Sequence, residues 1–149
     1  MTHFERTRDP YTVTTDPARR DDDAVHAYLS RSYWAEDISK ELVAKANAAS
    51  LCFSLLDGRK QIGFARVVTD RATFAYLCDV YVLEEYQGRG LGAWMMQGVM
   101  DHPDLQGLRR FMLVTRDAHR LYEPLGFRTV TNPSGHMEIV RPSPYKQGS

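Results

Sequence analysis

The sequence has little cysteine and little that could hold a metal ion. Its two cysteines, Cys52 and Cys78, each lie in an apolar, strand-like run and not at a paired ligand spacing. We therefore expect both to be reduced core residues. The five histidines never approach one another at metal-ligand spacing, and no helical His/Glu pair accompanies them. These absences predict a protein without a structural metal.

An excess of positive charge is also absent, because 19 basic residues offset 19 acidic ones. Without a net positive field, the chain lacks the usual electrostatic basis for binding nucleic acid. No apolar run approaches the length that spans a membrane, and the polar first residues, Met1 to Arg8, are followed by no apolar stretch. We expect a cytoplasmic protein that has neither nucleic acid nor a membrane as its partner.

What the sequence does have is the composition of an ordinary globular protein. Of its 149 residues, 43% are hydrophobic and 26% are charged. This length is close to that of one domain and suffices for a hydrophobic core without covalent cross-links. Since no internal repeat is found, we predict a single domain over residues 1–149.

Segments in which apolar residues recur at strand spacing and segments in which they recur at helix spacing follow one another along the chain. This order predicts a mixed α+β fold. The predicted strands are Tyr11–Thr15, Leu51–Leu56, Ile62–Val68, Thr73–Leu83, Phe111–Val114, Phe127–Val130 and Met137–Val140. The predicted helices are about Asp22–Ser32, Lys40–Ala48, Leu91–Met100 and Asp117–Leu125. An antiparallel meander followed by a strand-helix-strand crossover favours a central mixed, mostly antiparallel sheet of about seven strands with helices on both faces.

The loop Gln87–Gly92 has the composition of an anion-binding turn. Glycines at positions 88, 90 and 92 permit positive φ and let a phosphate approach the backbone closely. The helix that starts at Leu91 presents its N-terminal amides and dipole to the same place, and Arg89 can add a direct phosphate contact. A plain flexible turn is the alternative, but three alternating glycines cost stability that such a turn does not require. We predict a pyrophosphate site.

Two other phosphate-binding motifs are alternatives for this loop. A P-loop requires Lys and Ser/Thr after its glycine, where this sequence has Leu91 and Gly92. The dinucleotide fingerprint matches formally at Gly88, Gly90 and Ala93. However, that fingerprint places its first glycine directly after the strand, and here four residues intervene. Too little chain follows for a doubly wound sheet, so a nicotinamide-dependent protein is the weaker interpretation.

Together these residues resemble the GNAT superfamily of acyl-CoA-dependent N-acyltransferases. The family signature Q/R-x-x-G-x-G/A matches Gln87, Gly90 and Gly92, after a strand that ends Val80-Tyr81-Val82. A second family pattern matches Ala118, Tyr122, Gly126 and Phe127. The specific resemblance runs from about Gln61 to Phe127. Two positions depart from it, because Thr115 stands where many members have an Asn that contacts the coenzyme arm, and Pro124 replaces a frequent Lys.

The resemblance implies transfer of an acetyl group from acetyl-CoA to a primary amine. It implies that the coenzyme contacts Val80, Tyr81, Val82, Gln87, Gly88, Arg89, Gly90, Leu91, Gly92 and Thr115. The strand edge at Val80 and Val82 would pair with the pantetheine arm as an added strand does. Tyr122 matches the family tyrosine that protonates the leaving sulfur, and the alternative is a tyrosine that only packs its short helix on the sheet.

The acceptor side is less specific. Asp79 interrupts an apolar run where the strands would separate, so it is a candidate general base or amine anchor. An aspartate that is satisfied by backbone N–H groups at a strand bulge is an equal alternative. Tyr33 and Trp34 could line an acceptor pocket, although packing between two helices accounts for such aromatic pairs more often.

The identity of the amine and the acyl-chain preference stay open, and a homodimer is plausible. A catalytically idle CoA-binding module that regulates or scaffolds a partner is the alternative function, since a fold and a site do not fix activity. The presence of Tyr122 favours the enzyme.

Overall fold

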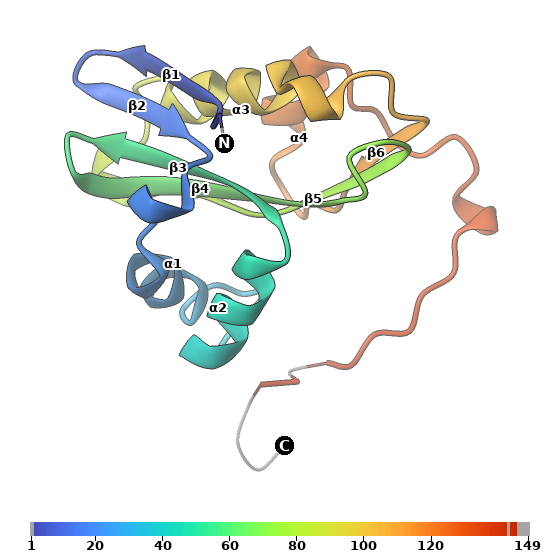
Figure 1. Cartoon of the computed structure of the whole chain (residues 1–149). Helices are drawn as coiled ribbons and strands as arrows, with labels where there is room; N and C mark the ends of the chain where they lie inside the picture. Colours follow the sequence, from blue (N-terminus) through green and yellow to red (C-terminus); the bar gives the residue numbers. More distant parts are fainter. Residues whose placement is uncertain (1, 143, 146–149) are drawn as a thin grey trace.

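Six strands form one sheet in which neighbours in space are also neighbours in sequence (Figure 1). They are β1 (Glu5–Arg8), β2 (Tyr11–Thr14), β3 (Leu51–Asp57), β4 (Lys60–Thr69), β5 (Phe74–Val82) and β6 (Arg110–Leu113). The computed structural model describes residues 2–142 and 144–145. Every neighbouring pair is antiparallel except β5 and β6, which are parallel. The predicted mixed, mostly antiparallel sheet is confirmed.

Helices cover both faces of this sheet, as predicted. Helices α1 (Asp22–Leu29) and α2 (Lys40–Ala48) lie on one face, and α3 (Leu91–Asp101) and α4 (His119–Tyr122) lie on the other (Figure 1). Short 3-10 turns connect them, namely η1 (Pro17–Arg19), η2 (Glu84–Tyr86), η3 (Pro103–Leu105), η4 (Glu123–Leu125) and η5 (Pro133–Gly135). Within the described part of the chain, no helix is both long and apolar enough to cross a membrane.

The two faces of the sheet bury separate apolar clusters, because side chains alternate along each strand. On the α3–α4 face, Phe53 and Leu55 are fully buried with the core of α3. On the α1–α2 face, Phe64 and Tyr81 pack against Val25 and its neighbours. Burying one such side chain contributes roughly 1.5–3 kcal/mol. The strands β3, β4 and β5 are thereby fixed between both helical layers, and they position the candidate site.

Strand β1 was not predicted from the sequence. Its residues Glu5–Arg8 are polar and mostly exposed, and they pair with β2 alone. A strand at the edge of a sheet has no apolar layer to contact on its outer side, so it lacks the alternating hydrophobic pattern by which strands are recognised. The first residues of the chain therefore extend the sheet.

The predicted count of about seven strands was wrong in the C-terminal part. Phe127–Val130 and Met137–Val140 do not join the sheet; in Figure 1 the chain leaves α4 and arches away from it. A strand-like sequence pattern indicates a capacity to pair, but within the described residues neither segment forms a ladder with β6, the last strand of the sheet. The core sheet thus ends at β6.

Candidate functional site

The glycine loop is held in the backbone conformation that its sequence predicted. Gly88 and Gly90 have left-handed φ angles of 81° and 76°. A Cβ at either position would meet no atom within 4 Å, so backbone conformation and not crowding requires glycine there. The Gln87 side chain donates a hydrogen bond through Nε2 to the Val82 carbonyl at 2.8 Å. This bond ties the loop to the end of β5.

The N-terminus of α3 differs from those of α1 and α2. Asp21 and Ser39 cap α1 and α2 by accepting hydrogen bonds from backbone amides of the first turn. Helix α3 begins after Gly90 with no side-chain cap and no acidic residue in its first turn. Its first amides therefore have no partner from a capping side chain, and the positive end of the helix dipole lies beside the glycine loop. This is the arrangement that binds an anion.

Arg89 lies against its own loop and does not project freely. Its guanidinium donates to the Tyr11 hydroxyl at 3.3 Å and to the Glu85 carbonyl at 3.1 Å, and its Cζ is 5.0 Å from the centre of the Tyr86 ring. The charge is nevertheless exposed beside the uncapped helix. A direct contact between Arg89 and a phosphate stays a prediction, and it requires the side chain to exchange at least part of these contacts.

The strands β5 and β6 separate beside this loop. Their pairing covers Phe74–Leu77 of β5 and stops there. A bulge between β4 and β5 lies at the same level, where the pairing register shifts. Among the described residues, the β6 side of Cys78–Val82 consequently has no strand partner, so backbone groups at Val80 and Val82 are available to an extended ligand. The Tyr81 side chain points to the other face, where its ring stacks on Tyr28 at 4.0 Å.

Asp79 lies at this bulge and has two side-chain partners. Its φ is 54°, in the left-handed region that is uncommon for residues other than glycine. Arg66 Nε donates to one carboxylate oxygen at 2.8 Å, and Trp34 Nε1 donates to the other at 2.9 Å. Arg66 also donates to the Ser50 hydroxyl. The bulge agrees with one of the two alternatives for Asp79, but in the structure side chains and not backbone N–H groups are seen to bind the carboxylate.

Arg66 was missed in the sequence, although a signal for it existed. It is the one cation within the apolar run of β4, and Asp79 is the one anion within the apolar run of β5. Because β4 and β5 are consecutive and antiparallel, opposite charges at these positions can meet across the pair. Both side chains are largely buried, with 18% and 12% of their surface exposed.

The predicted acceptor residues Tyr33 and Trp34 lie in the loop between α1 and α2. Their rings meet edge to face at 5.1 Å, and 55% and 39% of these residues remain exposed. The Arg116 guanidinium lies 3.8 Å above the centre of the Tyr33 ring. Trp34 therefore contacts Asp79, and Tyr33 contacts the loop before α4. Neither aromatic residue is buried in the hydrophobic core.

Tyr122 lies on α4 with 8% of its surface exposed. Burial, with a smaller contribution from Tyr33, raises its pKa to about 12. Among the described residues none hydrogen-bonds its hydroxyl, and Tyr122 lines a cavity of about 1320 Å³ that Thr115 and His119 also line. The Thr115 hydroxyl accepts a hydrogen bond from the Ala118 amide at 2.9 Å, so this predicted coenzyme residue also fixes the start of α4.

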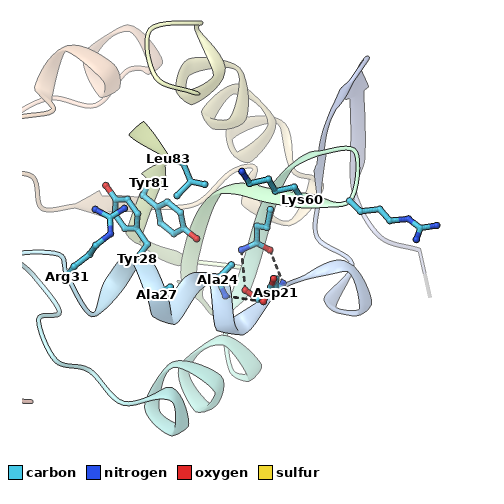
Figure 2. Close-up of a pocket in the computed structure, with 10 residues that line it drawn as sticks. Asp21, Ala24, Ala27, Tyr28, Arg31, Lys60, Tyr81 and Leu83 are labelled. Carbon is cyan, nitrogen blue, oxygen red and sulfur yellow. Dashed lines mark hydrogen bonds between the residues drawn. The ribbon is translucent and has the colours of Figure 1, made fainter. Parts of the chain in front are cut away.

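A second, smaller cavity of about 320 Å³ follows α1 on the opposite face (Figure 2). Tyr28, Tyr81 and Arg31 lie toward one end of it, and Asp21 lies toward the other. Tyr122 and Asp79 are not among its lining residues. It is therefore separate from Tyr122 and Asp79, although it includes the side chain of Tyr81.

Comparison with known proteins agrees with this geometry. A model of the acetyltransferase (GNAT) family matches residues 8–127. A relative from Gibberella zeae, named as a candidate acetyltransferase, is 39% identical over 139 residues, which cover 78% of this chain and 77% of that protein. The chain belongs to the GNAT acetyltransferase family. The resemblance predicted from the glycine loop and the Tyr122 pattern is confirmed, and it covers more of this GNAT chain than those motifs did.

Solved GNAT structures have the same fold. The structure of a candidate GNAT acetyltransferase from Xanthomonas campestris pv. campestris is 48% identical to this GNAT chain, with a TM-score of 0.88, and the match covers 91% of this chain and 96% of that one. A GNAT acetyltransferase from Elizabethkingia anophelis with acetyl-CoA bound is 18% identical, with a TM-score of 0.62 and coverage of 83% and 79%. The latter likeness concerns the fold alone.

Proposed function

We propose that this GNAT protein transfers an acetyl group from acetyl-CoA to a primary amine. The observation that carries the proposal is the uncapped start of α3 beside the unpaired end of β5, with Tyr122 on the same face of the sheet. Relatives of the same fold that bind acetyl-CoA support this choice of donor. The pyrophosphate would bind the amides of Gln87–Gly92, and the pantetheine arm would pair with β5 at Val80 and Val82.

In the proposed reaction, the neutral amine attacks the carbonyl carbon of the thioester directly. A carbon–nitrogen bond forms, the carbon–sulfur bond breaks, and the electron pair of that bond leaves on sulfur. The Tyr122 hydroxyl donates a hydrogen bond to the developing thiolate. Because its pKa is about 12, the phenol remains protonated at neutral pH. The proton that sulfur gains is replaced on Tyr122 by the one that the amine nitrogen loses, carried through water.

A covalent intermediate on cysteine does not fit the site. Cys78 is adjacent to the bulge, but burial, followed by the effect of Asp79 and Cys52, outweighs Arg66 and raises its pKa to about 12. The thiolate is the nucleophilic form of cysteine, so this thiol is inert at neutral pH. The same holds for the buried Cys52, whose pKa is raised to about 11. Direct attack by the amine therefore remains the proposed route.

Asp79 is proposed to anchor the amine, with a role as base as the alternative. Its carboxylate is shared between Arg66 and Trp34, and a carboxylate stabilised by a cation is a poor proton acceptor. Each oxygen still has a further lone pair that can accept a hydrogen bond from an ammonium group. The partly exposed Trp34 ring next to it would also attract a cation. These residues fit an amine that arrives as an ammonium group and gives one proton to water before its neutral form attacks the thioester.

A panel of primary amines tests the function. Acetyl-CoA consumption is followed through release of free CoA thiol, and products are checked by mass for one added acetyl group. We expect at least one amine class to accelerate thiol release in the wild-type protein. The alternative, a catalytically idle CoA-binding module, predicts that acetyl-CoA raises the unfolding temperature while no amine accelerates thiol release.

A further inference from the structure

The smaller cavity beside α1 is lined by more positive than negative charge. Its basic residues are Arg31, Arg59 and Lys60, and its one acidic residue is Asp21. Its volume of about 320 Å³ lies within the range of about 300–1,000 Å³ that is usual for small-molecule sites. The proposed reaction uses none of these four side chains. The cavity is thus a second candidate site, separate from the transfer chemistry.

The carboxylate and the amide side chain of the cavity are already bonded within the chain. The Asp21 carboxylate caps α1 by accepting a hydrogen bond from the Ala24 amide at 3.0 Å. Gln61 accepts from the Asp21 amide at 2.9 Å and donates to the Asp21 carbonyl at 3.4 Å (Figure 2). The charged groups left to meet a ligand are therefore the cations, which select an anion.

An apolar strip forms the rest of the cavity. Ala24 and Ala27 of α1 lie on one side of it and Leu83 on the other (Figure 2). Tyr28 stacks on Tyr81 with ring centroids 4.0 Å apart and closes the end nearest Arg31. The alanines leave room that longer side chains on α1 would fill. A hydrated inorganic ion would leave this strip bare, so the ligand that fits is an organic anion with a compact apolar body.

Two cations of the cavity also contact η2, the turn that leads from β5 into the glycine loop. The Arg31 guanidinium donates to both carboxylate oxygens of Glu84, at 2.7 and 3.0 Å. Lys60 Nζ lies 5.5 Å from the centre of the Tyr86 ring. Arg89 of the glycine loop lies 5.0 Å from the centre of the same ring. The cavity and the glycine loop are therefore connected through the first and last residues of η2.

These contacts can be exchanged for contacts with a ligand. The Arg31 and Glu84 side chains are 54% and 56% exposed, and ion pairs so open to water contribute little to stability. An anion in the cavity draws Arg31 from Glu84 and Lys60 from Tyr86, so η2 loses two contacts beside the glycine loop. The added negative charge also lowers the positive potential that attracts the coenzyme phosphates. Both effects oppose coenzyme binding.

We propose that this cavity is an effector site for a small organic anion, either a carboxylate or a phosphate monoester, and that its occupation weakens the binding of acetyl-CoA. The coupling rests on the proposed coenzyme site, whereas the anion site does not. By thermodynamic linkage, acetyl-CoA weakens the binding of the effector by the same factor.

Calorimetric titration without acetyl-CoA tests the site, with benzoate and phenyl phosphate as the probes. We expect saturable binding of one probe molecule per chain, and the tighter of the two identifies the acidic group that the site prefers. Inorganic phosphate lacks the apolar body and benzyl alcohol lacks the charge. Each should bind at least roughly tenfold more weakly than the better probe.

Two variants and two matched controls locate the probe. Ala27→Leu fills the cavity without changing a charge, and Lys60→Gln removes one cation; each should weaken probe binding roughly tenfold or more. Ala44→Leu and Lys45→Gln make the same changes on α2, outside the cavity, and should bind the probe as the wild type does. The proposal is overturned if neither probe binds or if binding survives both cavity variants. Binding that is lost in Gly90→Val and kept in Ala27→Leu also overturns it, because the probe then occupies the glycine loop.

Titration of acetyl-CoA at increasing probe concentrations measures the coupling. The apparent Kd for acetyl-CoA should rise roughly five- to tenfold and then level off, because the coupling between two separate sites is finite. A Kd that does not change, or one that rises in proportion to the probe without limit, contradicts the effector role. If acetyl-CoA does not bind at all, the proposed function and the coupling both fail, while the anion site is decided by the probe titrations alone.

Discussion

The two faces of the sheet differ in whether their polar groups have side-chain hydrogen-bond partners. On the α3–α4 face, α3 begins without a side-chain cap and the Tyr122 hydroxyl has no partner among the described residues. On the α1–α2 face, side chains cap both helices, and Asp79 is held by Arg66 and Trp34. Groups that are left open in this way on the α3–α4 face can hydrogen-bond a ligand. In the proposed function, the α3–α4 face binds the coenzyme through groups that lack side-chain partners, and the α1–α2 face contributes an acceptor site whose residues are already held by one another.

The largest effect should come from Tyr122→Phe on the α3–α4 face. Removing only the hydroxyl should lower the rate of acetyl transfer by roughly 10²- to 10⁴-fold, the usual contribution of a positioned general acid. Acetyl-CoA affinity should barely change, because the ring keeps its packing against Phe127. Single-turnover mixing with a saturating amine measures the chemical step separately from product release.

Tyr76→Phe is the matched control for that change. Tyr76 lines the same cavity and its pKa is also raised by burial, so the same hydroxyl is removed from the same surroundings. It should leave single-turnover transfer unchanged. If Tyr122→Phe is as active as this control, Tyr122 is a packing residue and the assignment of the acid is wrong.

Gly90→Val tests whether the backbone at the start of α3 binds the coenzyme. Valine is strained at a φ of 76° and would displace the amides that are proposed to bind the phosphate. Since hydrogen bonds to charged groups contribute about 1.5–3 kcal/mol, acetyl-CoA should bind roughly 10- to 100-fold more weakly. Calorimetric titration measures the change.

Gly58→Val is the control that distinguishes the effect of backbone strain from the loss of contacts with the ligand. Gly58 has a φ of 60° in the turn between β3 and β4 and equally open surroundings. Both variants should lose about 1–3 kcal/mol of stability. Equal losses of acetyl-CoA affinity in the two variants would mean that the loop acts through stability alone.

Substitutions on the α1–α2 face should change the KM for the amine and leave the affinity for acetyl-CoA unchanged. Asp79→Asn removes the charge that is proposed to anchor the amine, and Trp34→Phe removes one hydrogen-bond donor to it. We expect the KM for the amine to rise about tenfold in the first variant and two- to fivefold in the second, the scale of a modest hydrogen bond. Acetyl-CoA affinity should be unchanged. A loss of coenzyme affinity in either variant would break the division between the two faces.

The smallest effect is the one expected from pH. Because burial raises the pKa of Tyr122 to about 12, the folded protein keeps the phenol protonated where a free tyrosine ionises at about 10. The stability that this contributes is present below about pH 10 and is lost as the pH rises through 12. From about pH 7 to 9, transfer should therefore rise as the amine deprotonates. If the rate of transfer instead falls between about pH 7 and 9 in the wild-type protein and not in Tyr122→Phe, the phenol ionises well below pH 12 and the assignment is contradicted.

The glycine loop, the start of α3 and the family could be predicted from the sequence because their signals are local. Glycine spacing, the helix start at Leu91 and the Tyr122 pattern are each contained in a few consecutive residues. The boundaries of Lys40–Ala48 were also correct, since Ser39 supplies a side-chain cap directly before it. Local rules suffice where a short segment determines its own conformation.

The rest depends on contacts between distant segments. The Arg66–Asp79 pair requires the register of β4 against β5, and the contact of Trp34 with Asp79 spans 45 residues. Met137–Val140 has a strand pattern, but it pairs with no strand among the described residues. The periodicity of a segment predicts whether it can bury a face or pair as a strand. Its actual partners depend on the fold of the whole chain.

Calorimetric titration of the wild-type protein with acetyl-CoA and, separately, with NAD tests the central claim most directly. The claim is that the uncapped start of α3 and the open end of β5 form one acetyl-CoA site. We predict saturable binding of one acetyl-CoA per chain and no binding of NAD at the same concentrations. Binding of NAD without binding of acetyl-CoA would contradict the account.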